Sequence, residues 1–163
     1  MRNMAQIGKF FVTTALFFTF IMNSVLADSH KTKPNTQLSP SDVINIVIDA
    51  LKNNDSANGD DGIATVFEFA SPNNKSVTGP LPRFTKMIKG GFEDMLNHTS
   101  SEFSKMDITD DTALQAVWLT SRSGTQTGYV FQLGKQKAGK FKGMWMTESV
   151  MPIGTRKPQG QSI

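Results

Sequence analysis

The sequence contains no cysteine, only two histidines, one tyrosine and two tryptophans among 163 residues. The absence of cysteine excludes disulfides, zinc–thiolate sites, iron–sulfur clusters and a cysteine nucleophile. His30 and His98 lie far apart in the sequence and have no spacing typical of a metal site. The sequence therefore carries no strong catalytic or metal-binding motif, and we predict neither a metal site nor a cofactor.

The chain is basic only because of its N-terminal segment. It has 17 Lys and Arg against 14 Asp and Glu, a net charge of +3 and a pI near 9.2. Residues 1–27 contain Arg2 and Lys9, no acidic residue, an apolar run from Phe10 to Met22, and a small-residue site before Asp28. These features predict a signal peptide cleaved between Ala27 and Asp28.

Cleavage leaves 15 basic against 14 acidic residues, so the mature chain is nearly neutral. We expect the protein to be exported, periplasmic or secreted, and to meet the membrane only transiently through its signal peptide. The alternative is an uncleaved anchor, which the short apolar run disfavours because a span needs about 20 mostly apolar residues.

The remainder divides into three parts by composition. Residues 28–38 are polar, contain Pro34 and predict a flexible linker. Residues 39–153 hold the periodic apolar segments of a globular domain. Residues 154–163 are rich in Gly, Pro and Gln and predict a disordered tail.

Three helices are predicted in the first half of this domain. The first begins at Ser39 and Pro40, a good N-cap and first helical residue, and runs to Lys52. A second spans residues 62–70, and a loop is expected over residues 72–80. A third spans residues 82–97, with a kink or break at Gly90 and Gly91 because two glycines destabilise a helix interior by roughly 2 kcal/mol.

The second half is predicted to be strands. Residues 113–120, 127–133 and 141–150 are rich in strand formers and are separated by turn sequences, and residues 101–108 can supply a fourth strand. Alternation along each strand allows Trp118, Tyr129 and Trp145 to share one face. Helices followed by an antiparallel meander predict an α+β fold with the helices on one face of the sheet.

Several segments resemble a known family. These are SPSDVINIVIDALKNND, GIATVFEFASPNNK and TGPLPRFTKMIKGGFEDMLNH, with FASP and TGPL-x-RF the most specific phrases, and more loosely YVFQLGKQKAGKFKGMWM. They resemble a family of uncharacterised domains in the nuclear transport factor 2-like, or ketosteroid-isomerase-like and cystatin-like, superfamily. The resemblance implies three N-terminal helices on a curved, cone-shaped antiparallel sheet, with an apolar pocket between them, but no particular activity.

The pocket is the principal functional feature that we predict. Its expected lining is aromatic and methionine-rich, and Arg83 is the charged residue expected at its mouth. The lining residues are Trp118, Tyr129, Phe131, Trp145, Met87, Met95, Met144 and Met146. The alternative is a filled core formed by the same side chains.

Catalysis would require an acid or base in that pocket. Candidates are His98 and Glu68, with Tyr129 as a polar partner, and Asp94 as a further carboxylate. None of them belongs to a recognisable signature. We therefore favour a non-catalytic protein, and an isomerase- or dehydratase-type enzyme is the alternative.

Other polar clusters have simpler interpretations. Asp55, Asn58, Asp60 and Asp61 resemble a calcium loop but fail the EF-hand spacing, so a solvated connector is favoured. The lysines at 135, 137, 140 and 142 surround one hairpin turn and are typical of edge protection, so nucleic acid is not an expected partner.

Three glycosylation sequons occur, at Asn54, Asn74 and Asn97, and would be used only in a eukaryotic secretory pathway. Taken together, the sequence predicts an exported α+β protein that binds a small apolar or amphipathic ligand, or another copy of itself through its sheet.

Overall fold

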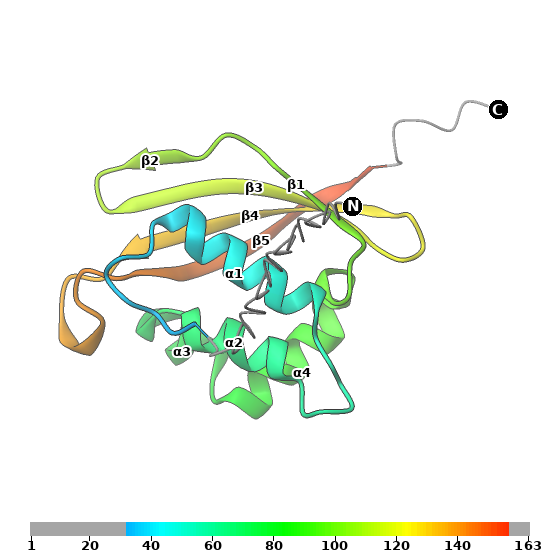
Figure 1. Ribbon diagram of the computed structural model, residues 1–163, viewed down its shortest axis with the longest axis horizontal. Coiled ribbons are helices and arrows are strands. Elements are labelled where there is room, and N and C mark those ends of the chain that lie inside the picture. Colours follow the sequence, from blue (N-terminus) through cyan, green and yellow to red (C-terminus); the bar gives the residue numbers. More distant parts are fainter. Residues whose placement is uncertain (1–31, 157–163) are drawn as a thin grey trace, which may run out of the picture.

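The computed structural model describes residues 32–156, which form four helices followed by a five-stranded antiparallel sheet (Figure 1). The helices are α1 (Pro40–Lys52), α2 (Asp61–Phe69), α3 (Pro72–Thr78) and α4 (Leu81–Gly91), and the strands are β1 (Ser100–Phe103), β2 (Asp107–Thr109), β3 (Thr112–Thr120), β4 (Gln126–Lys135) and β5 (Trp145–Arg156). Two 3₁₀ turns, η1 (Glu93–Met95) and η2 (Gly139–Phe141), complete the secondary structure of these described residues. The α+β fold predicted from the sequence is confirmed.

The predicted signal peptide, its cleavage site at Ala27 and Asp28, the first part of the predicted linker and the last residues of the predicted tail lie outside the described residues. Strand β5 continues through residues 154–156, which the composition predicts as part of the tail.

The first helix begins as its sequence predicts. The Ser39 hydroxyl oxygen accepts from the backbone N–H of Asp42 at 3.2 Å, and the Asp42 carboxylate accepts from the Ser39 backbone N–H at 2.8 Å. This capping box satisfies two backbone donors that the helix itself leaves free. The apolar stripe of α1, ending at Leu51, is fully buried against the sheet.

Four helices form where three were predicted, because residues 72–78 are helical. Ser71 and Pro72 repeat the start signal of α1, and the Ser71 hydroxyl oxygen accepts from the Asn74 backbone N–H at 3.0 Å. None of the residues of α3 is fully buried. The helix therefore lacks the apolar stripe on which a prediction from periodicity depends.

The predicted third helix breaks where its glycines lie. Helix α4 ends at Gly91, and Phe92 leads into η1, so the segment up to residue 97 is two elements rather than one. The predicted strand over residues 101–108 is likewise divided into β1 and β2, which pair with opposite ends of β3.

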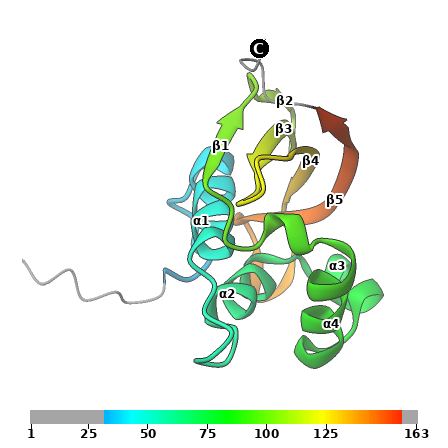
Figure 2. The same cartoon turned by 90° about the vertical axis from the view of Figure 1, so that its right-hand side faces the viewer.

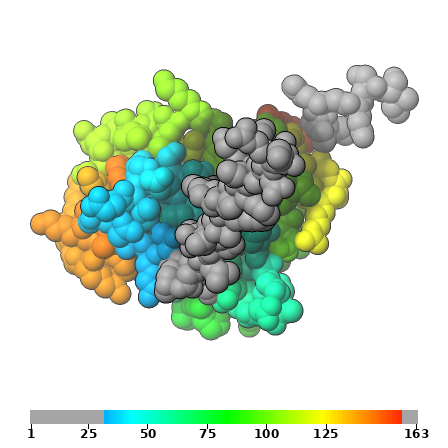
Figure 3. Space-filling model, in the orientation of Figure 1, coloured from blue at the N-terminus to red at the C-terminus, as the bar shows by residue number. Residues whose placement is uncertain are grey.

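The sheet order is β1-β3-β4-β5, with β2 also paired to β3. All four helices lie on one side of the curved sheet (Figure 2), and the hairpins β3–β4 and β4–β5 lie at opposite ends of the molecule (Figure 3). The register places Val117 of β3 opposite Tyr129 of β4 and Trp118 opposite Gly128. Paired residues share a face, so the buried Val117 and Tyr129 face the helices and Trp118 faces away.

Candidate functional site

A cavity of about 340 Å³ lies between the helices and the last two strands of the sheet. Most of its wall is apolar, and all four helices contribute to it together with β4 and β5. The apolar lining residues are Val47 and Leu51 of α1, Val66 of α2, Ala70, Val77 of α3, Phe84, Met87 and Ile88 of α4, Phe92, Met95, Phe131 of β4 and Val150 of β5. Volume and lining are typical of a small-molecule site rather than of a filled core.

Helix α4 and the turn that follows it supply much of this wall. Phe84, Met87 and Ile88 follow one another at spacings of three and four, so they lie on one face of the helix. The chain leaves the helix at Gly91, and Phe92 and Met95 then also face the cavity. Phe92 and Met95 follow Ile88 at spacings of four and seven residues, so they continue the apolar face of α4 across the break.

Helix α3 packs beside β5 and forms a polar wall of the cavity. Asn73, Asn74 and Thr78 line the cavity from this helix, and Val77 stands at the rim with 69% of its surface exposed. The helix is held to β5 by its first residues: the Ser71 backbone N–H donates to the Thr147 carbonyl at 2.9 Å, and Asn74 Nδ2 donates to the Glu148 carbonyl at 3.0 Å.

Glu148 is the one ionisable residue among those that line the cavity within residues 32–156. It lies at a register shift of β5, where Thr147 pairs with Leu133 and Ser149 with Gln132, which leaves Glu148 as the extra residue of a β-bulge. Its carboxylate accepts from Ser71 Oγ at 2.8 Å and from Gln136 Nε2 at 2.8 Å.

Thr147 is the second unusual polar residue of this wall. Its side chain is 4% exposed, and its hydroxyl has no hydrogen-bond partner within the described chain. Thr147 pairs with the buried Leu133, so its side chain lies on the helix-facing side of the sheet, where the cavity is. An unpaired buried hydroxyl costs about 1–3 kcal/mol.

The predicted pocket residues fall into two groups. Met87, Met95 and Phe131 line the cavity, whereas Trp118, Tyr129, Trp145, Met144, Met146 and Arg83 do not. The prediction that both tryptophans and Tyr129 share a face is wrong for Trp118, because the register turns it to the outer face of the sheet. There Trp118 packs over Gly128 and carries the Arg156 guanidinium 4.3 Å from its ring centroid.

Tyr129 and Arg83 are close to the cavity but point elsewhere. The Tyr129 ring packs on Phe92, with ring centroids 6.1 Å apart, and burial, with a smaller contribution from the charge of Asp94, raises its pKa to about 12. Arg83 folds over Gly79 in the turn between α3 and α4, instead of standing at the mouth.

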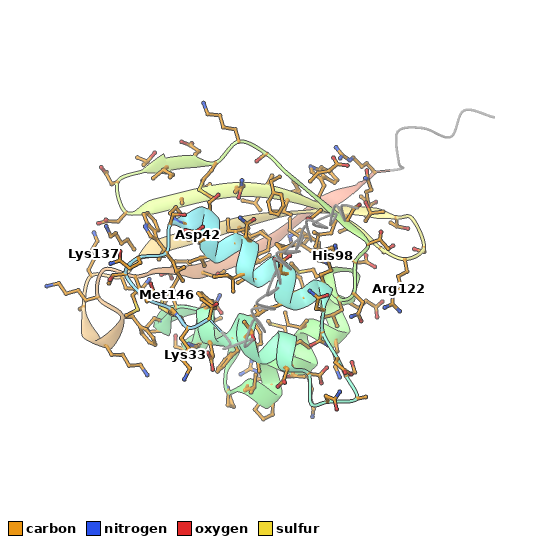
Figure 4. All side chains as sticks on the ribbon, in the orientation of Figure 1. Lys33, Asp42, His98, Arg122, Lys137 and Met146 are labelled. Carbon is orange, nitrogen blue, oxygen red and sulfur yellow. The ribbon has the colours of Figure 1, made fainter. Side chains whose placement is uncertain are left out.

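The three candidate acid–base residues are not brought together. Glu68 is exposed on α2, while His98 is buried beyond the C-terminal end of α1 (Figure 4), and neither lines the cavity. His98 Nδ1 lies 2.8 Å from the Met95 carbonyl oxygen, so this nitrogen carries the proton, and Nε2 has no partner among the described residues. Burial lowers the pKa of His98, which favours its neutral form.

In the acidic loop before α2, the carboxylates of Asp55 and Asp60 form hydrogen bonds or an ion pair within the fold. The Asp55 carboxylate accepts from Asn58 Nδ2 and from the Ala57 backbone N–H, and Asp60 forms an ion pair with Lys89 at 2.7 Å. No group of three or more His, Asp or Glu within residues 32–156 is arranged to hold a metal ion.

The sequon asparagines have structural roles. Asn54 is 5% exposed, and its Nδ2 donates to Asp60 Oδ1 at 3.0 Å. Asn97 Nδ2 donates to the Asn54 carbonyl at 2.7 Å, and Asn74 Nδ2 is held by Glu148 as described above. Each nitrogen that a glycan would use is therefore already a hydrogen-bond donor within the fold.

The lysines of the β4–β5 hairpin do not line the cavity, and Lys137 lies at one end of the molecule (Figure 4). Lys137 pairs with Asp111 at 3.6 Å, and Lys140 lies over the Phe141 ring.

The sequence gives no indication of the polar wall as a unit. Asn73, Asn74, Thr147 and Glu148 become neighbours only because α3 packs beside the edge of β5. The second Ser-Pro pair, at Ser71 and Pro72, is the one sequence signal that could have indicated the helix. Nothing in the sequence marks the bulge at Glu148.

A family model described as Domain of unknown function (DUF4864) matches residues 34–158. The chain belongs to this family. The matched range includes all four helices and all five strands, and therefore the whole cavity. No curated protein and no solved structure matches the chain. No helix within residues 32–156 is long and apolar enough to cross a membrane.

Proposed function

We propose that this protein is an exported, non-catalytic binding protein whose helix–sheet cavity takes a small apolar or amphipathic ligand. The observation that carries the proposal is the cavity of about 340 Å³, lined mainly by apolar side chains and bordered on one side by polar residues, of which most are uncharged. Such a combination binds small organic molecules through apolar burial and orients them through a few hydrogen bonds.

The arrangement of the polar residues favours binding over catalysis. His98, Glu68 and Tyr129 lie outside the cavity wall, and both oxygens of the Glu148 carboxylate accept hydrogen bonds from neutral side chains. An enzyme of the isomerase type needs a base and a hydrogen-bond donor that converge on one substrate atom. The helices packed on one face of an antiparallel sheet support placing the family in the nuclear transport factor 2-like superfamily.

Binding of the apolar fluorescent dye N-phenylnaphthylamine, followed by its emission, tests the proposal. Met87 lines the cavity and is half-buried, so Met87→Trp should fill part of the space and weaken dye binding about tenfold or more. Met151→Trp is the matched control, since Met151 is 53% exposed on β5 and does not line the cavity. Equal dye binding by both variants, or none by the wild-type protein, would refute a ligand site here.

Export is tested separately by sequencing the N-terminus of the protein recovered from its native host. The sequence predicts a start at Asp28, and an intact Met1 would contradict the cleaved signal.

The outer face of the sheet supports a second candidate function, self-association. Leu114, Met151 and Ile153 are 40–53% exposed, and Leu114 and Met151 lie on the same outer face as Trp118. Large exposed apolar patches are typical of interaction surfaces. Sedimentation equilibrium should then show a dimer that Met151→Glu dissociates, and a wild-type monomer at all concentrations would refute it.

A further inference from the structure

The lining of the cavity changes along its length from buried and apolar to exposed and polar. We propose that a ligand enters apolar end first and keeps its polar group in water at the mouth. This inference rests on the proposed function and adds the class of ligand. The cavity selects amphiphiles with one polar group at one end, and rejects those with a polar group in the middle of the apolar part.

The inner end of the cavity is buried and apolar. Thr147 is the one polar residue in this part of the wall within the described chain, and its hydroxyl has almost no accessible surface, so a ligand would not contact it. The other fully buried residues that line the cavity are all apolar: Val47, Leu51, Val66, Ala70, Phe84, Ile88, Met95 and Phe131. The inner wall therefore offers a ligand no side-chain hydrogen-bonding group.

The outer end of the cavity lies between α3, α4 and β5, which Figure 2 shows on the same side of the molecule. Asn73 and Val77 of α3 are exposed there, and Met87 of α4 is half-buried. Apart from Thr147, the polar residues of the lining all belong to this end: Asn73, Asn74, Thr78, Glu148 and Ser149. The mouth of the cavity is therefore at its polar end.

Most of the polar side chains at the mouth are already hydrogen-bonded within the fold. Asn74 Nδ2 donates to the Glu148 carbonyl at 3.0 Å, and the Thr78 hydroxyl donates to the Asn74 carbonyl at 2.9 Å. The Ser149 hydroxyl donates to Gln132 Oε1 at 3.3 Å. A polar group of a bound ligand therefore finds its hydrogen-bond partners mainly in the water at the mouth.

The position of the polar group along the ligand then decides the affinity. A hydroxyl at the end of an alkyl chain stays in water at the mouth while the chain fills the inner end. A hydroxyl in the middle of the chain would be buried against apolar side chains without a partner, which lowers the affinity by at least about tenfold.

Displacement of N-phenylnaphthylamine by 1-octanol and by 4-octanol tests the proposal. The two alcohols have the same formula and similar hydrophobicity, and they differ in the position of the hydroxyl. The wild-type protein should require about tenfold more 4-octanol than 1-octanol for the same loss of dye emission.

Val66→Thr separates the effect of hydrogen bonding from that of ligand shape. Val66 is buried on α2 and lines the cavity, and threonine has nearly the same shape but adds a hydroxyl to the inner wall. The variant should lower the ratio of the two displacing concentrations about threefold by improving 4-octanol binding. Val130→Thr is the matched control, since Val130 is half-buried on the outer face of the sheet and does not line the cavity. Circular dichroism checks that both variants are folded.

The outcomes separate this inference from the proposed function. If neither the dye nor 1-octanol binds the wild-type protein, the binding function itself fails. If both bind, and the two alcohols displace the dye at equal concentrations, the ligand site stands and the apolar-end-first orientation is refuted. The orientation is also refuted if the ratio is the same in Val66→Thr and Val130→Thr, because ligand shape alone would then explain the preference.

Discussion

Replacing Asn54 by alanine should destabilise the protein far more than the same change at the adjacent Asn53. Helix α2 lacks an ordinary N-cap: Asp60 precedes it in a left-handed conformation, with φ of 59°, and makes no capping hydrogen bond. Asn54 supplies the cap instead, although it lies seven residues before Asp61, because its Oδ1 accepts from the Ile63 backbone N–H at 3.1 Å.

The magnitude follows from the groups that the substitution leaves unpaired. Ile63 is fully buried, so its free N–H would cost about 1–3 kcal/mol, and the bond from Asn54 Nδ2 to the Asp60 carboxylate adds about 1 kcal/mol. The total is about 3 kcal/mol, a large part of the 5–15 kcal/mol typical of a domain. Asn53→Ala removes one exposed bond to the Asp49 carbonyl and should cost about 0.5 kcal/mol.

Urea unfolding followed by circular dichroism measures both variants. The midpoint of Asn54→Ala should fall by roughly 1.5 M at an unchanged slope, and that of Asn53→Ala by much less. If the two midpoints agree within about 0.3 M, Asn54 does not cap α2 and the account of this buried asparagine is wrong.

Two further predictions concern packing and pH. A Cβ on Gly62 would lie 2.1 Å from the Ala50 carbonyl oxygen, so Gly62→Ala should lower the free energy of unfolding, measured in urea, by at least about 2 kcal/mol. Gly90 has open space around it, so Gly90→Ala should raise the free energy of unfolding by about 0.5 kcal/mol. The opposite order would contradict the close approach of α1 and α2. Burial lowers the pKa of His98, so the unfolded chain binds its proton first as the pH falls below about 6.5, and stability should decrease there by up to about 1.4 kcal/mol per pH unit. The free energy of unfolding between pH 7.5 and pH 5 should therefore fall less in His98→Gln than in the wild type; parallel curves would exclude His98 as a source of this dependence.

The sequence predicted those elements whose local chemistry and packing agree. The start of α1 at Ser39 and the break at Gly91 depend on neighbouring residues alone, and the structure has both. Helix α3 was missed because none of its side chains is fully buried, so hydrophobic periodicity carries no signal for it.

Only part of the cavity lining could be predicted from the sequence, because the sequence does not determine how neighbouring strands are paired. Alternation along a strand shows which residues share a face within that strand, but not which face of the sheet each strand turns inward. Phe131 was placed correctly, whereas the pairing of Trp118 with Gly128 places that indole on the outer face. The bulge at Glu148 and the packing of α3 beside β5 arise from tertiary contacts that no local pattern predicts.

Native mass spectrometry of the protein purified without detergent tests the central claim, a ligand-binding cavity, most directly. Incubated with octanol, the wild-type protein and Met151→Trp should each carry one bound molecule per chain that is lost on unfolding, and Met87→Trp should carry little or none. Equal occupancy in Met87→Trp, or no bound molecule in the wild-type protein, would contradict a ligand site between the helices and the sheet.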